Sequence, residues 1–376
     1  MSIGVADPRD PNEAELTRLA TLLREAEKIQ GVSLGRNAWR RLRRSRMSMA
    51  ALGFLLLLSI TAIFTPLLPL QPPRTVNLEK RYSPPTLEHF WEESAALSPS
   101  ATGGLPATLS EGFGQLGWFS QQLLEWRVQI FGEFSLGNLC GTDALGRDLL
   151  SRVIWGARIS LAVGLVATMV SLVIGVSYGA IAGYVVGWLD NAMMRLVDVL
   201  YSIPFIFVVI YIISILSDPA LKAELEGYGI DRIVIFFIVV GAIYWLTMAR
   251  VVRGQVLSLK QHQFIEAART IGAGRLRIIF RHLVPNLLSI VIVYLTLTIP
   301  SVMLFEAFLS FLGLGVEPPD VSWGLLAYEG VKNINPIQIN WWLVLFPNLA
   351  LAMTLFSLNF LGDGLRDALD PRLKNR

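Results

Sequence analysis

The chain has 376 residues, of which 53% are hydrophobic and only 16% carry a charge, and its formal net charge is +3. Soluble proteins carry about 25% charged residues, so this composition excludes a soluble enzyme, a disordered chain and a nucleic-acid-binding protein. It is typical of an all-α protein that crosses a membrane several times.

The first 46 residues are polar, and we expect them to lie on the cytoplasmic side. Residues 12–29 repeat apolar side chains at helical spacing, which predicts an amphipathic helix that covers a partner or the bilayer surface. Residues 33–46 place Trp39 and Leu42 among six arginines. That pattern predicts a helix lying in the membrane interface, with its arginines bound by lipid headgroups.

Six apolar stretches are long enough to cross a membrane, whose hydrocarbon core of about 30 Å needs about 20 helical residues. Between the first two lies a segment at 69–140, rich in Pro, Ser and Gly, that predicts a partly irregular extracytoplasmic insertion with a short helix at 115–131. A transmembrane core at 141–361 and a cytoplasmic tail at 362–376 follow. The predicted spans are 47–68, 159–184, 192–216, 232–250, 286–308 and 341–361.

Basic residues predict the orientation of these spans. Arginine and lysine gather before the first span, between the fourth and fifth, and after the last, whereas the loops at 217–231 and 309–340 carry one lysine each. With an even number of spans, the three basic segments face the same side, which the positive-inside rule identifies as the cytoplasm. Both termini are therefore expected there.

The sequence argues against several other chemistries. Cys140 is the only cysteine, and the three histidines lack the spacing of metal ligands, so we expect no disulfide, metal or cofactor in this chain. No lysine follows a glycine, so the phosphate-binding P-loop is absent from the sequence. An intramembrane enzyme would need convergent catalytic groups, which are not evident.

Few charges lie inside the predicted spans. Arg195 and Asp198 are three residues apart on one helix and are expected to neutralise each other, and Glu306 falls near the outer end of the fifth span. Ion-coupled transporters keep ionisable groups near the membrane midplane, and none is evident there. This weakens the alternative of an ion-gradient-driven secondary transporter or channel.

Three glycines recur every four residues along the second span. Gly175, Gly179 and Gly183 line up a surface without side chains, which lets another helix come close. We interpret them as a helix-packing face, within this chain or between subunits.

The connection at 251–285 is long for an idle loop. Residues 266–270 favour a helix, Gly272 permits a sharp turn and 275–283 favour a second helix, so two short helices at an angle are predicted. Pro285 is expected to disrupt the helix where the fifth span begins.

Within this connection, Ala267 and Ala268 let a partner backbone approach, and Glu266 offers a charge to an arginine. Glu266-Ala267-Ala268, followed by Gly272 and then His282-Leu283-Val284-Pro285, resembles the EAA loop of ABC importer permeases. Other segments are similar to the oligopeptide and dipeptide branch, and the tail resembles that of its second, C-type permease subunit. These segments are 141–152, Met194-Arg195 with Asp198, Ser202 and Pro204, 305–315, and the tail at 359–371.

The resemblance implies a six-helix permease of the type I importer kind in the bacterial inner membrane. It implies no catalysis by this chain, because two partner ATPases would bind ATP and Mg²⁺. It also implies a homologous second permease subunit, an extracytoplasmic substrate-binding protein and di- or oligopeptides as cargo. Glu266 is then expected to meet an arginine of one ATPase.

Two further segments are candidates for the solute route or an outer gate. They contribute Gly141, Thr142 and Asp143, and Glu306, Ser310 and Gly313. Packing without solute contact explains these residues equally well.

Overall fold

The computed structural model describes residues 34–88, 91–93, 112–114, 116–216, 218, 220–221, 224 and 232–369. The helix predicted at 12–29 lies outside these residues, as do the last seven residues of the tail and much of the insertion.

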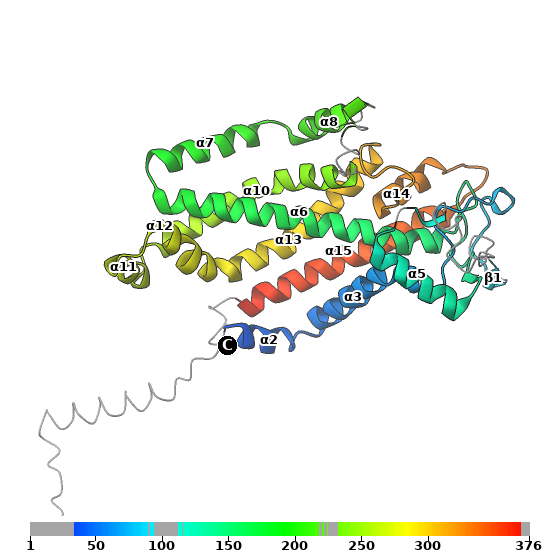
Figure 1. The fold of residues 1–376 in the computed structure, drawn as a ribbon, viewed down its shortest axis with the longest axis horizontal. Coiled ribbons are helices and arrows are strands. Elements are labelled where there is room, and N and C mark those ends of the chain that lie inside the picture. Colours follow the sequence, from blue (N-terminus) through cyan, green and yellow to red (C-terminus); the bar gives the residue numbers. More distant parts are fainter. Residues whose placement is uncertain are drawn as a thin grey trace, which may run out of the picture.

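The described residues form an elongated helical bundle (Figure 1). Its long helices are α3 (Arg46–Ile63), α6 (Leu149–Val185), α7 (Trp188–Ser202), α8 (Phe205–Leu216), α10 (Arg232–Leu259), α13 (Val284–Phe311) and α15 (Trp341–Leu369). Its shorter elements are α2 (Leu34–Leu42), α5 (Trp118–Phe131), α11 (Gln263–Thr270), α12 (Arg275–Arg277), α14 (Trp323–Lys332), the π-helix η4 (Ile278–Leu283), and the 3₁₀ turns η1 (Thr65–Leu67) and η2 (Leu78–Lys80). One antiparallel pair, β1 (Trp91–Glu93) with β2 (Phe134–Leu136), joins two parts of the insertion, with Trp91 opposite Leu136.

The predicted all-α membrane fold is confirmed, with one difference in the third span. Among the described residues, five helical segments are long and apolar enough to cross a membrane alone; α7 and α8 pass the same test only together, as a pair bent by 80°, which gives six if the pair counts as one span. The continuous helix expected over 192–216 is therefore wrong. Pro204 offers no backbone N–H and disfavours a helical residue before it, and Ile203 is accordingly extended (φ −82°, ψ 123°).

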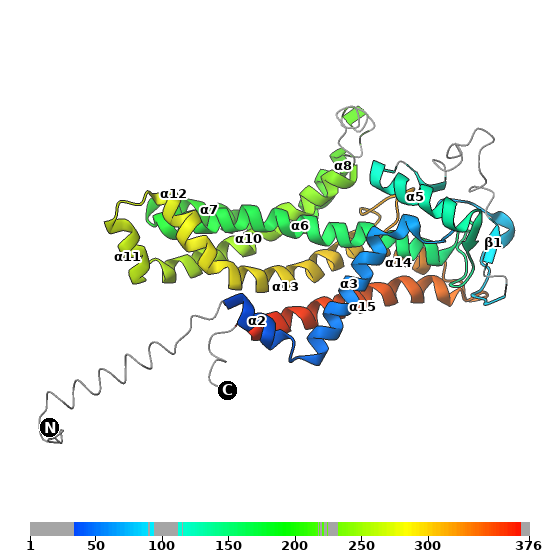
Figure 2. The same cartoon turned by 60° about the horizontal axis from the view of Figure 1, so that its bottom comes forward.

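The glycine face predicted on the second span packs against α10 of the same chain. In both views α6 and α10 lie side by side (Figures 1 and 2). A Cβ atom added at Gly175, Gly179 or Gly183 would press on a backbone carbonyl oxygen of α10, those of Trp245, Ala249 and Arg253 in turn. The missing side chains therefore set how closely the two helices approach.

Gly179→Leu is expected to destabilise the fold, because the new side chain would collide with the Ala249 backbone rather than with a side chain that can turn away. Overpacking of this kind costs about 1–3 kcal/mol or more. A thermal unfolding series in detergent would measure the loss. Gly53→Leu is the matched control, since nothing lies near that position on α3; equal melting of both variants would contradict this account.

The insertion is held to the end of the first span by a buried arginine. The guanidinium of Arg127 on α5 donates to the carbonyl oxygens of Leu68 (3.0 Å) and Leu70 (2.9 Å), and burial lowers its pKa to about 10. Arg127 thus remains a cation at neutral pH while it caps backbone acceptors. The helix predicted at 115–131 is confirmed as α5.

The basic segment before the first span forms α2, which lies against α15. Leu42 is buried beside Gly364, whereas the Trp39 side chain stays 49% exposed among the arginines. Ser45 then caps α3, its hydroxyl accepting the backbone N–H of Ser48. One face of α2 therefore packs on the bundle, and Trp39 remains accessible.

Candidate functional site

The segment that joins α10 to α13 projects from one end of the bundle, with α5 and β1 at the opposite end (Figures 1 and 2). A three-residue turn after α10 leads into α11, and a short loop then leads into α12. The segment 263–285 is called the coupling segment below.

The end of α11 has a tightly specified turn. Gly272 adopts φ +82°, a left-handed conformation that favours glycine. Its N–H donates to the carbonyl of Arg269 (2.9 Å), and the N–H of Ala273 donates to that of Ala268 (3.0 Å). This is the Schellman pattern, in which a glycine ends a helix by satisfying its last carbonyls.

Pro285 was expected to disrupt the helix at the start of the fifth span, and this expectation is wrong. The helix runs without a break from Arg275 to Phe311, and the residues before Pro285 widen into the π-helix η4. A proline ring clashes with the carbonyl four residues earlier in an α-helix, and a wider turn relieves that clash. The second short helix, predicted at 275–283, is therefore the first part of the fifth span itself. In the orientation expected above, this part extends toward the cytoplasm.

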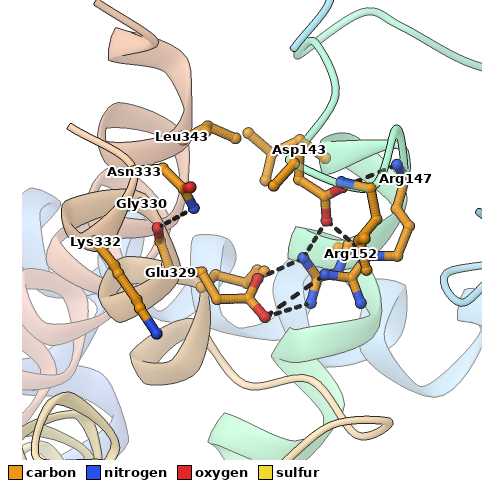
Figure 3. A pocket seen from close by; sticks show the side chains of 12 residues that line it. Asp143, Arg147, Arg152, Glu329, Gly330, Lys332, Asn333 and Leu343 are labelled. Carbon is orange, nitrogen blue, oxygen red and sulfur yellow. Dashed lines mark hydrogen bonds and ion pairs between the residues drawn. The ribbon is translucent and has the colours of Figure 1, made fainter. Parts of the chain in front are cut away.

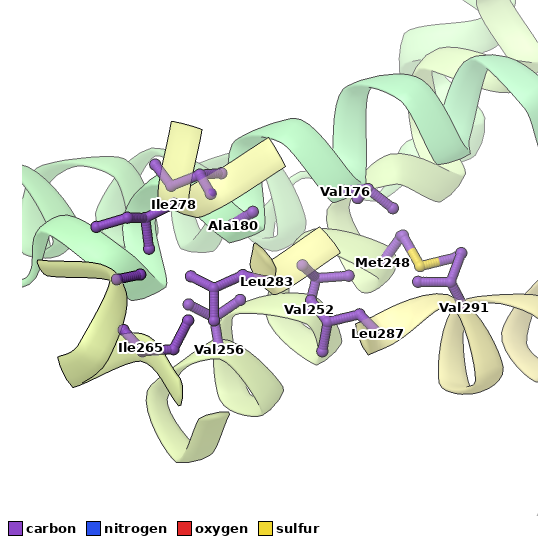
Figure 4. Close-up of a cluster of buried hydrophobic side chains, with 12 residues drawn as sticks. Val176, Ala180, Met248, Val252, Val256, Ile265, Ile278, Leu283, Leu287 and Val291 are labelled. Carbon is purple, nitrogen blue, oxygen red and sulfur yellow. The ribbon is translucent and has the colours of Figure 1, made fainter. Parts of the chain in front are cut away.

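The helix α11 is amphipathic. Ile265 and Ala268 are buried, whereas Glu266 and Ala267 on the same helix are exposed. The buried side belongs to a cluster of apolar residues from α6, α10, η4 and α13 (Figure 4), among them Ala180, Val256 and Leu283. The exposed side leaves a carboxylate and a small residue open to a partner.

Polar contacts hold the coupling end to the bundle. Arg253 of α10 binds Asp190 of α7 through two hydrogen bonds of 2.6 and 2.7 Å, and Asp190 is buried. The Arg269 guanidinium lies 5.3 Å from the centre of the Tyr184 ring, which suits a cation–π contact. Sequence reasoning missed the Asp190–Arg253 pair, because its partners are 63 residues apart.

Asp198 is not neutralised by Arg195. Its carboxylate lies 2.8 Å from Arg250 of α10, and both side chains are largely exposed. Arg250 also lies over the Tyr201 ring, 4.3 Å from its centre. The expected pairing within one helix is therefore replaced by one between two helices.

At the opposite end of the bundle, two arginines and two carboxylates form a connected network (Figure 3). The buried Arg152 lies 2.6 Å from Asp143 and 2.6 Å from Glu329 of α14. Arg147 adds a 2.7 Å contact to Asp143. These side chains line a cavity of roughly 250 Å³. The network joins the start of α6 to α14.

The two residues before Asp143, Gly141 and Thr142, make contacts within the fold. Gly141 turns the chain with φ +77°, and the Thr142 hydroxyl donates to the carbonyl of Lys80 while accepting the N–H of Ser83 (2.8 Å). The indole of Trp342 donates to the Thr142 carbonyl (3.1 Å). These contacts fix Gly141 and Thr142 within the fold, whereas Asp143 lines the cavity described above.

Glu306 and Ser310 meet at the other end of α14. The buried Glu306 carboxylate accepts hydrogen bonds from the hydroxyls of Ser310 (2.8 Å) and Ser322 (2.7 Å), and Ser322 caps α14. Gly313 lies beyond α13 with φ +75° and is exposed. The two candidate gate segments therefore border opposite ends of α14 and form two sites.

Cys140 is expected to react slowly with alkylating reagents at neutral pH. Burial, with the nearby Asp148 charge, raises the pKa of its thiol to about 11. At neutral pH the fraction of reactive thiolate is then roughly 100-fold smaller than for a thiol whose pKa is two units lower. Labelling should accelerate about tenfold per pH unit. Intact-mass kinetics with iodoacetamide from pH 7 to 9 would measure this; a pH-independent rate would contradict it.

A bundle of apolar helices, with a helix at one end that exposes Glu266 and Ala267 and buries Ala268, fits a membrane-spanning transport subunit. The family model described as "Binding-protein-dependent transport system inner membrane component" matches residues 175–375, and "N-terminal TM domain of oligopeptide transport permease C" matches residues 33–85. The chain belongs to the binding-protein-dependent transport system inner membrane component family. It is a multi-pass permease subunit of an ABC transporter in the bacterial inner membrane.

Individual relatives agree with this assignment. The dipeptide transport system permease protein DppC of Bacillus subtilis is 36% identical over 93% of this chain and 90% of its own. The oligopeptide transport system permease protein OppC of Haemophilus influenzae is 48% identical over 62% of this chain and 70% of its own. The glutathione transport system permease protein GsiD of Escherichia coli is 35% identical over 89% and 90%.

Proposed function

We propose that this chain is the C-type permease subunit of an ATP-driven importer of di- or oligopeptides. The cargo is inferred from relatives whose names specify dipeptide or oligopeptide transport. The proposed partners are a homologous permease subunit, two ATPases and an extracytoplasmic binding protein. The termini and the coupling segment face the cytoplasm in this proposal.

The observation that carries the coupling role is the two-sided α11. Ile265 and Ala268 bind it to the bundle, and Glu266 and Ala267 stay exposed. A partner ATPase that moves α11 therefore also moves the helices packed beneath it. In this proposal the bundle switches between two arrangements, and ATP biases one of them. The arginines of α2, with Trp39 between them, would meet lipid headgroups on the same side.

Reconstitution tests the proposal. The chain would be purified with its permease partner and ATPases, placed in vesicles, and supplied with binding protein and a labelled dipeptide. We expect accumulation that requires ATP, the ATPases and the binding protein together. Parallel arms with a pentapeptide and with glutathione distinguish the cargoes. Uptake by this chain alone, driven by an ion gradient, would overturn the proposal.

A further inference from the structure

A second cavity lies beside the insertion, at the end of the bundle opposite the coupling segment. Its volume is roughly 380 Å³, within the range of small-molecule sites. The insertion forms one wall, α6 a second, and the loop before α14 a third. The polar lining comprises Arg74, Ser120, Trp155, Arg158 and Asp320.

The cavity contains more hydrogen-bond donors than acceptors. Arg158 of α6 donates to the Ser120 hydroxyl (2.9 Å), and its guanidinium lies 4.9 Å from the centre of the Trp155 ring. A guanidinium has five N–H donors, so one hydroxyl leaves most of them available. The buried indole N–H of Trp155 has no partner among the described residues.

No carboxylate pairs with Arg158 in the described part of the chain. Asp320 lines the same cavity, but it binds Arg74 (3.3 Å). Two other arginines of the long helices do have carboxylate partners: Arg152 bridges two carboxylates and Arg253 binds Asp190 at two points. A charged residue in a membrane helix that faces a cavity is by default a candidate functional group.

We propose that this cavity is a subsite for the carboxylate of the transported solute, and this inference rests on the proposed function. Arg158 supplies the charged N–H donors that a carboxylate requires, and the apolar lining accommodates a side chain. This lining includes Phe113, Leu116, Ile159, Ala162 and Val321. The insertion thereby has a role, because it contributes Ser120 and one wall of the site.

The site lies next to the loop that leads to α14. Val321 lines the cavity, and the adjacent Ser322 binds Glu306 and caps α14. A solute in the cavity would therefore press on the residue beside this capping contact. In the proposed orientation, the cavity is on the extracytoplasmic side, where a solute enters.

The test uses a cysteine placed in the cavity wall. Leu116→Cys, in a Cys140→Ser background that leaves no other cysteine in this chain, would be labelled with a neutral maleimide in the full permease–ATPase complex without binding protein, and the label on this chain would be measured. We expect millimolar dialanine to slow labelling several-fold, whereas alanyl-alaninamide should not, since it lacks the carboxylate. Arg158→Gln should remove this protection, and Arg158→Lys should retain part of it.

Three outcomes would overturn the inference: equal protection by the amide, protection that survives Arg158→Gln, or no protection by dialanine. Dialanine would be tested up to about 50 mM, which is roughly the weakest dissociation constant expected of so small a ligand. Equal protection by acetate would overturn the assignment to the solute. ATP-driven dipeptide uptake by the Cys140→Ser parent is measured separately. Loss of uptake with protection intact would therefore count against the proposed function and leave the site standing.

Discussion

Glu266→Lys is expected to abolish ATP-driven uptake while the chain still inserts into the membrane. The Glu266 side chain is exposed on α11, and no ion pair links it to another described residue, so the fold does not depend on its charge. If it meets an arginine of the ATPase, reversal replaces attraction with repulsion. Losing one partner of such a pair costs about 2–5 kcal/mol, which weakens docking at least roughly 30-fold. Vesicle uptake and co-purification of the ATPase measure the two effects.

Gln261→Lys is the control, because it places the same cationic side chain at an exposed position just before α11, although it changes the net charge by one unit and Glu266→Lys by two. Gly272 supplies an independent probe of the same segment. Gly272→Pro removes the N–H that donates to Arg269 and imposes a negative φ, so the turn after α11 cannot form and uptake should be lost. Normal uptake and ATPase binding in either the Glu266 or the Gly272 variant would contradict the coupling role.

Alanine substitutions at Gly272 and Gly274 test the effect of backbone conformation alone, because neither new methyl group would be crowded. A Cβ atom at Gly272 or at Gly274 would meet nothing within 4 Å, but only Gly272 has a positive φ. Gly272→Ala should therefore impair coupling through strain of about 1 kcal/mol, and Gly274→Ala should have little effect.

Arg152→Ala is expected to cause the largest loss of stability. The substitution leaves Asp143, which is nearly buried, and Glu329 without the guanidinium that bridges them. Breaking a buried ion pair by removing one partner costs about 3–5 kcal/mol. Thermal aggregation of the detergent-solubilised complex would report the change, and limited proteolysis would show whether α14 loosens.

Arg147→Ala is the comparison, because Arg147 contacts the same carboxylates from a more exposed position. It should cost distinctly less than Arg152→Ala. Arg152→Lys should lie between the two, since an ammonium cannot reproduce the paired guanidinium bonds. Wild-type stability in Arg152→Ala would show that the network does not hold α14 to α6.

Sequence patterns predicted the parts of the molecule that depend on local order. Apolar runs located the spans, and four-residue spacing identified the glycine face that packs on α10. The helix at 266–270 follows from neighbouring residues, and the resemblance to the EAA loop singles out Glu266 within it. Each of these signals lies within about 20 consecutive residues.

The errors have different physical sources. Pro204 breaks the third span although the apolar run continues through it, whereas a π turn accommodates the ring of Pro285 and the helix continues. The pairs Asp190–Arg253 and Arg152–Glu329 join distant residues, and no local spacing reveals them. The cavity around Arg158 required the insertion to be folded against α6.

The π turn ahead of Pro285 also affects how variants of this region should be designed. It holds one residue more than an α-helix would, and each helical residue advances the side-chain direction by about 100°. Removing a single residue from Ile278–Leu283 would therefore rotate α11 and its carboxylate around the axis of α13 instead of merely shortening the connection. Length changes at this junction would misdirect the docking face even where every contacting side chain is retained.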